Sequence, residues 1–407
     1  MDNKIFIDLD KSDKLPQITA FQGQVYIKKN GRIIVRNSIF EDIDTLTEQD
    51  LEYILVNFKQ YISPILTSMY IPKASIMEVI KKVAPEFKVR FKTEKPGGNK
   101  IIPISPDEFF EGGKIFDDII SGINPEWTET QKYKYLYNQT GIMLSYDLNV
   151  LQHTVNANFH EKYSRNIFTS ISKNWGICAS FAAIYDYLCY KCDLDSTILS
   201  EDDHDYVMIS NSNGEDYLTD TTYDAARLKF GLKTRNFAIP KEEFEKNSHH
   251  LKQTEADEYE FASLDNEEIK EIDKSIGYLE NFGGDYTDEA LGKLANGLEG
   301  NTFDEKAMNF IERIKNIKTI GRPTDSDYVE IIKWILSKST DIEFAKKINV
   351  ASYAYEDTKE LPRKIVFKIE EDNENKKYYE FDYRTKEYKE VNELDLINVD
   401  KELGTEL

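Results

Sequence analysis

The sequence has few cysteines, no long apolar run and no start typical of a leader peptide. Its three cysteines are too few, and odd in number, for a disulfide framework. No stretch approaches the roughly 18 consecutive apolar residues of a membrane span. Residues 1–6 do not place a basic region before an apolar core, as a secretory signal would. These absences predict a cytoplasmic protein with no membrane partner.

Positive charge is scarce relative to negative charge. The 407 residues include 52 Lys and Arg against 74 Asp and Glu, which gives a formal net charge of −22. Such a chain repels phosphate backbones, so nucleic acid is not expected as a partner. Apolar residues make up 40% of the sequence and aromatic residues 12%, which is a folding composition. The length allows roughly two to four domains.

One cysteine stands where a thiol could act as a nucleophile. Cys178 follows Gly176 at the start of an apolar segment that reads as a helix. Free thiols have a pKa of about 8.5 and need help to form a thiolate at neutral pH. A sharp entry at Gly176 would put Cys178 in the first helical turn, where N–H groups and the helix dipole stabilise an anion.

A histidine and an aspartate follow at spacings that suit a catalytic triad. His204 opens the first strand of an expected hairpin, and Asp220 ends the second. If the turn centres near Asn213, His204 lies opposite about Thr221, within roughly 5 Å of its cross-strand neighbours. The sequence therefore predicts Cys178 as nucleophile, His204 as base and Asp220 as the residue that orients the imidazole. The four other histidines lie in irregular or polar segments: His153, His160, His249 and His250.

Turn and cap signals predict elements elsewhere. Asn30 and Gly31 predict a hairpin turn, and Thr47 and Thr128 each open a capping box before a helix. Gly141 is expected to end the second of these helices. Breaks are expected at residues 96–99 and 111–113. Later helices are expected near 265–280, 287–298, 303–318 and 325–337, and strands at 365–369, 377–383 and 387–391.

The segments around the three residues resemble the core of the transglutaminase-like superfamily, within the papain-like fold. The matching motifs are Gly-Ile-Cys at 176–178, the histidine that opens a strand, and Tyr-Leu-Thr-Asp-Thr-Thr at 217–222; the similar span is about 128–225. The resemblance implies a cysteine nucleophile (Cys178), a histidine (His204) and an aspartate (Asp220). Members of the superfamily hydrolyse or transfer amide bonds through a thioester, and bacterial members are often peptidases or amidases.

Two features depart from the family pattern. Asp205, Tyr206 and Val207 come directly after His204, where family members often carry a tryptophan, and the interval between Cys178 and His204 is short for the family. For the oxyanion, the backbone N–H of Cys178 is a generic candidate, and Trp175 is a candidate for the second donor.

The expected fold class is α+β with a papain-like, transglutaminase-like core. The expected domains are an N-terminal α/β domain (1–120), the catalytic core (121–240), a linker and helical segment (241–345) and a C-terminal β-rich meander (346–407).

Three functional readings stay open at this point. The favoured one is an amide-bond hydrolase acting on a protein or peptide, because water is the default acceptor of a thioester. A transamidase is the alternative enzyme, and a catalytically inactive binding scaffold is the alternative outside catalysis. No cofactor is expected. No metal is expected either, because the pair Cys189 and Cys192 has no second pair of ligands.

Overall fold

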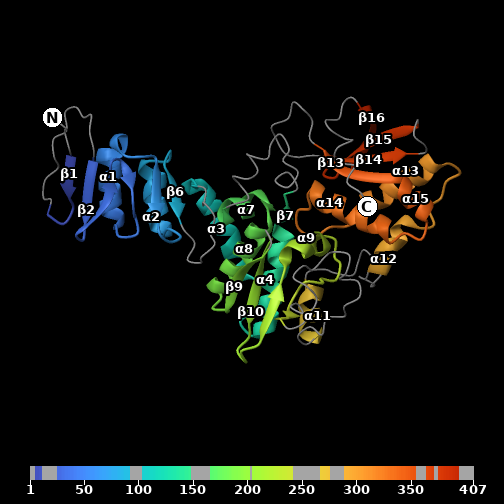
Figure 1. Ribbon diagram of the computed structural model, residues 1–407, viewed down its shortest axis with the longest axis horizontal. Helices are drawn as coiled ribbons and strands as arrows, with labels where there is room; N and C mark the ends of the chain where they lie inside the picture. The colour runs from blue at the N-terminus through green and yellow to red at the C-terminus, as the bar shows by residue number, and fades with distance from the viewer. Residues whose placement is uncertain are drawn as a thin grey trace. The chain divides into compact units, whose positions relative to one another are not determined.

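The computed structural model describes residues 5–11, 25–91, 103–147, 166–201, 204–241, 266–275, 288–353, 364–370 and 375–393. The chain is mixed α and β with several small sheets, which confirms the coarse fold class (Figure 1). It forms two compact units, Met1–Asp118 with Glu161–Lys173, and Ile119–His160 with Asn174–Leu407. The finer four-part division stays a prediction.

The first unit contains a four-stranded sheet, a parallel strand pair and helices. The sheet has the order β1 (Ile5–Asp8), β2 (Val25–Lys29), β3 (Arg32–Arg36) and β4 (Ile39–Phe40). The other elements are α1 (Glu48–Phe58), η1 (Lys59–Tyr61), β5 (Ile65–Ser68), α2 (Ala74–Val83), β6 (Lys88–Phe91), α3 (Pro106–Ser121) and α7 (Ile167–Lys173).

Two local predictions in this unit are confirmed and one is wrong. Asn30 and Gly31 have positive φ values of 50° and 74° and join β2 to β3. Thr47 forms the capping box of α1. The break expected at 111–113 is absent, because both of its glycines lie inside α3. A Cβ at Gly112 would lie 2.5 Å from the Phe168 carbonyl oxygen of α7, so the glycine serves close helix packing. The break expected at 96–99 lies outside the described residues.

The second unit begins with helices around an antiparallel sheet. The elements are α4 (Glu129–Met143), β7 (Ser145–Tyr146), β8 (Trp175–Gly176), α8 (Cys178–Lys191), β9 (Ser196–Glu201), β10 (His204–Ser210), β11 (Asp216–Thr219), α9 (Thr221–Lys229), β12 (Ile239–Pro240) and α11 (Asn266–Ser275). The sheet order is β12-β11-β10-β9, and β7 pairs with β8 in parallel. Helix α8 packs on β9 and β10, and α4 packs on α8 and α9 (Figure 1).

The rest of this unit is a helical layer on a β meander. Its elements are α12 (Asp288–Gly292), η2 (Lys293–Ala295), α13 (Phe303–Lys315), α14 (Asp325–Ser337), α15 (Ile342–Lys347), β13 (Ile348–Tyr353), β14 (Lys364–Glu370), β15 (Lys376–Asp382) and β16 (Glu387–Val391). The expected meander is confirmed, and β13 adds a strand that the sequence reading missed.

A single hydrophobic core joins this layer to the end of α9. It contains Ala226 and Phe230 beside buried side chains of α13, α14 and β13 to β15. The Phe230 and Tyr328 rings meet edge to face with centroids 5.0 Å apart. Residues on both sides of position 240 therefore share one core.

One further helix prediction is wrong, and one helix was not predicted. Helix α4 begins after the Thr128 capping box, as expected, but runs through Gly141 to Met143. A Cβ at Gly141 would lie 2.2 Å from Leu228 Cδ1 of α9, so this glycine allows two helices to approach and does not end one. Helix α9 itself, directly after Asp220, was not predicted.

Candidate active site

The nucleophile candidate lies at the start of a helix, as the sequence predicted. Cys178 is the first residue of α8, where backbone N–H groups have no intrahelical acceptor. The chain turns at Asn174, whose φ is 62°, passes through β8 and enters the helix. Gly176 is required for space and not for a positive φ, because a Cβ there would lie 2.8 Å from the Cβ of Ser180. The Ser180 hydroxyl in turn accepts the Ile177 N–H at 3.3 Å.

The histidine and the aspartate are brought together at the ends of neighbouring elements. His204 Nε2 lies 2.6 Å from Asp220 Oδ2. The ladder between β10 and β11 pairs Val207 with Thr219, one residue away from the register that the sequence suggested. Val207 is its first paired residue in β10, so the ladder does not include His204. His204 instead pairs with Glu201 of β9, a strand that the sequence reading missed.

Asp220 is held at each of its polar atoms. It is the N-cap of α9, and its Oδ1 accepts the Thr222 N–H at 3.0 Å while Oδ2 faces His204. Its N–H donates to the Asn236 carbonyl at 2.8 Å, and its carbonyl accepts the Tyr137 hydroxyl at 2.9 Å. A carboxylate fixed in this way can orient an imidazole without moving itself.

The His204 ring is set up to hold a proton. Burial alone would lower its pKa, but hydrogen bonds to Asp220 and Cys178, and the charges of both, raise the pKa of His204 to about 10. Because Nε2 is engaged by Asp220, Nδ1 is the nitrogen left for the thiol. At neutral pH this arrangement favours an imidazolium between a carboxylate and the sulfur.

Three tyrosines surround this group. The Tyr146 ring stacks on Phe181 at 6.5 Å, and burial and the Cys178 charge raise its pKa. The Tyr223 ring lies 5.1 Å from the His204 ring, and burial, Asp220 and Cys178 raise the pKa of Tyr223 to about 12. The Tyr206 ring stacks at 6.4 Å from His204. These hydroxyls therefore stay protonated and can donate hydrogen bonds at neutral pH.

A second buried carboxylate supports the first. Asp224, on the first turn of α9, accepts the Tyr137 hydroxyl at 2.7 Å and the N–H groups of Arg235 and Asn236 at 2.9 and 2.8 Å. Since the Asn236 carbonyl holds the Asp220 N–H, Asp224 fixes the loop on which Asp220 depends. The sequence reading missed this role, although Asp220 and Asp224 stand one helical turn apart.

Of the other tryptophan, histidine and cysteine residues considered in the sequence, some lie in the described part of the chain and some do not. Trp175 is buried on β8, three residues before Cys178. His153, His160, His249 and His250 lie outside the described residues. Cys189 is fully buried, and burial raises its pKa well above the usual range of a thiol. Burial and Asp193 also raise the pKa of Cys192. None of the three cysteines forms a disulfide.

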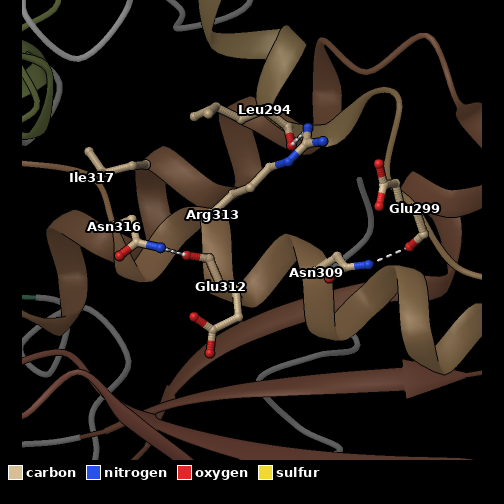
Figure 2. A pocket seen from close by; sticks show the side chains of 7 residues that line it. All are labelled: Leu294, Glu299, Asn309, Glu312, Arg313, Asn316 and Ile317. Atoms are coloured by element: carbon tan, nitrogen blue, oxygen red, sulfur yellow. Dashed lines mark hydrogen bonds between the residues drawn. The ribbon is translucent and has the colours of Figure 1, made fainter.

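A surface pocket of 430 Å³ lies elsewhere in the second unit, along α13 (Figure 2). Its lining contains neither cysteine nor histidine: Leu294, Glu299, Asn309, Glu312, Arg313, Asn316 and Ile317. Figure 2 shows the Arg313 guanidinium reaching the Leu294 carbonyl, at 3.1 Å. Arg313 also donates to the Asn296 carbonyl at 2.7 Å, so it serves the end of a helical turn. The candidate catalytic residues therefore lie outside this pocket.

Comparison with known proteins does not extend these observations. No protein-family model matches the chain, and no curated protein matches it in sequence. Among the described residues, no helix is long and apolar enough to cross a membrane. Nor do the described ranges contain a cluster of three or more His, Cys, Asp or Glu side chains that could hold a metal ion.

Proposed function

We propose that this chain is a cysteine-dependent amide-bond hydrolase that acts on a protein or peptide. In this proposal residues 121–240 form a transglutaminase-like, papain-like catalytic core. The observation that supports it most strongly is the chain of contacts from the Cys178 thiol through His204 to Asp220, at 2.6 Å for the last pair. A cytoplasmic location stays a prediction.

The reaction would begin from the pair in which His204 already holds the thiol proton as an imidazolium. The Cys178 sulfur then attacks the amide carbonyl carbon and forms a tetrahedral oxyanion, which the N–H groups at the start of α8 would stabilise. Collapse of this intermediate breaks the C–N bond, and His204 donates its proton to the leaving amine. A thioester on Cys178 remains.

The same residues would then release the acid product. Acylation removes the thiolate charge, which is one of the causes of the raised pKa of His204. The imidazole gives up its proton more readily and can act as a base toward water. Water gives one proton to His204 as it adds to the thioester carbonyl, the C–S bond breaks, and the sulfur leaves as a thiolate beside the imidazolium. Asp220 keeps the ring oriented throughout.

Selective alkylation tests the proposal. Wild-type protein is treated with iodoacetamide at about pH 6, where ordinary thiols are mostly protonated. Mass spectrometry of each cysteine-containing peptide should show Cys178 reacting at least about tenfold faster than Cys192, because an imidazole holds its proton. An electrophilic probe that mimics an amide should label Cys178 in the same way.

Two variants separate an activated thiol from an exposed one. His204→Ala should bring the Cys178 rate to that of Cys192, and Asp220→Asn, which keeps an N-cap side chain, should lower it by at least about tenfold. A Cys178 that reacts no faster than Cys192 in the wild-type protein would instead identify a binding scaffold that has the site without its chemistry.

A further inference from the structure

The two strands next to the start of α8, β7 and β8, are too short to form a stable pair on their own. β7 and β8 have two residues each. Their backbone bonds include Ser145 N–H to the Asn174 carbonyl at 3.2 Å and Asp147 N–H to the Gly176 carbonyl at 2.8 Å. An isolated pair of strands is marginal even when it is longer than this. Other contacts must therefore fix Tyr146 and the entry to Cys178.

Residues 320–327, named here the bracing segment, supply such contacts from far along the chain. The Arg322 carbonyl accepts the Asn174 side-chain N–H at 2.7 Å, at the turn that leads into β8. The Ile320 N–H donates to the Lys229 carbonyl at the end of α9, at 2.7 Å. Gly321, with a φ of 68°, lies so close to α4 that a Cβ would be 2.5 Å from Ile142 Cγ2.

A buried ion pair fixes the same segment to β7. Asp327 is 2% exposed, and its Oδ2 accepts the Ser145 hydroxyl at 2.6 Å and the Thr324 N–H at 2.8 Å. Its Oδ1 lies 3.2 Å from Nζ of Lys229, a fully buried lysine whose ammonium also donates to the Leu144 carbonyl. A buried charge without its partner is strongly destabilising, so Asp327 and Lys229 are expected to stay paired in the folded protein. This pair fixes the first residue of β7 and the residue before it.

We propose that the bracing segment positions the nucleophile, with Asn174 and Asp327 as positioning residues for Cys178. Asn174 fixes the turn before β8, and Asp327 fixes β7, so the two strands that flank the thiol are tied to one helix start. This inference rests on the proposed function and adds to it: residues about 150 positions beyond the nucleophile decide where the sulfur lies relative to His204. Small displacements of a reacting group can cost up to about 10²-fold in rate.

The variant Asn174→Gly tests the turn contact without straining the backbone. Glycine adopts the φ of 62° freely, so the change removes the bond to the Arg322 carbonyl without straining the backbone. The matched control is Asn37→Gly, at a φ of 51° in the first unit. Asn174→Gly should lower the iodoacetamide rate of Cys178 at about pH 6 by at least about tenfold, and Asn37→Gly should leave it unchanged.

The three cysteines report position and folding separately. Cys192 lies at the other end of α8, and Cys189 is buried between them. If Asn174 positions the thiol, Cys178 in Asn174→Gly no longer reacts quickly with iodoacetamide at about pH 6. Its alkylation rate then depends on pH in the same way as that of Cys192. Cys192 keeps its rate and Cys189 stays protected. Asp327→Asn, which removes the charge beside Lys229, should give the same pattern.

The alkylation rates of the wild-type protein and of Asn174→Gly test the proposed function and the role of the bracing segment separately. If wild-type Cys178 reacts no faster than Cys192, the proposed function fails and the inference fails with it. If wild-type Cys178 is fast and Asn174→Gly leaves its rate and pH profile unchanged, the inference alone is overturned. Alkylation of Cys189, together with a slower rate at Cys178, also overturns the inference, because the bracing segment then stabilises the fold in general.

Discussion

Asp220 combines two tasks that are often divided between residues. One carboxylate oxygen caps α9, and the other faces the imidazole at 2.6 Å. The cap places the helix dipole beside the carboxylate, which stabilises its charge. The carboxylate in turn stabilises the proton on His204. A residue that serves both the fold and the site couples the ionisation of the site to the stability of the whole unit.

That coupling predicts a pH dependence of unfolding. The pKa of His204 is raised to about 10 by its neighbours against the opposing effect of burial, whereas an unfolded imidazole has a pKa of about 6.5. The resulting stability is complete below about pH 6.5 and is lost as the pH rises toward about 10. The measurement is best made in Cys178→Ser protein, since a thiol also releases a proton in this range. Without the thiol, the interactions with Cys178 no longer raise the pKa of His204, whereas those with Asp220 still do.

Urea unfolding at several pH values gives the free energy directly. In Cys178→Ser protein it should fall with rising pH by up to about 1.4 kcal/mol per unit, the slope for one proton. Cys178→Ser with His204→Asn is the matched control and should lack this component. Identical pH profiles for the two proteins would show that His204 has an unperturbed ionisation in the folded chain.

At the scale of elements, the sequence was informative where local signals decide structure. The Asn30-Gly31 turn, the caps at Thr47 and Thr128, and the helix after Cys178 are all where they were predicted. Each depends on a few consecutive residues. The ordering of thiol, imidazole and carboxylate was also readable, because helix and strand ends bring them together. Whether they form an active site stays a prediction.

Helix α9 shows why other elements were not readable. Its charged residues Asp224, Arg227 and Lys229 are all buried. Polar and apolar residues therefore do not separate onto opposite faces of the helix, and its sequence shows no apolar periodicity. Their partners lie in other parts of the chain, such as Asp327 for Lys229. The bracing segment was unreadable for the same reason. Only the folded structure shows that Asn174 and Arg322 meet.

Glycines inside helices give a matched prediction at this scale. Gly112 and Gly113 are neighbours in α3, but a Cβ at Gly112 would meet Phe168 backbone atoms at 2.5 Å, whereas one at Gly113 would meet a Phe168 ring atom at 4.0 Å. Gly113→Ala should stabilise the protein by about 0.5–1 kcal/mol through helix propensity. Gly112→Ala should destabilise it by about 1–3 kcal/mol because backbone must shift. Thermal unfolding of both variants checks the difference, and equal effects would contradict the close packing of α3 on α7.

At the scale of the whole molecule, the core of the second unit does not follow the order of the sequence. The end of α9 contributes Phe230 and Lys229 to contacts with α14, a helix that begins about 95 residues later. A catalytic core that ended at residue 240 would therefore lack part of its interior. The length of chain needed for a stable site is set by these contacts and not by the span of the family-like motifs.

A chain that ends at residue 240 should accordingly fail to fold into a stable unit around Cys178. Phe230 would lose the Tyr328 ring, and the fully buried Lys229 would lose Asp327. Breaking a buried ion pair costs about 3–5 kcal/mol, a large share of the 5–15 kcal/mol that typically stabilises a folded domain. Circular dichroism melting should show no cooperative transition in its second unit, and Cys189 should be alkylated as fast as Cys178. The 407-residue chain is the control and should keep Cys189 protected. A truncated chain with Cys189 protected and Cys178 still fast at about pH 6 would mean that α14 is dispensable for the site.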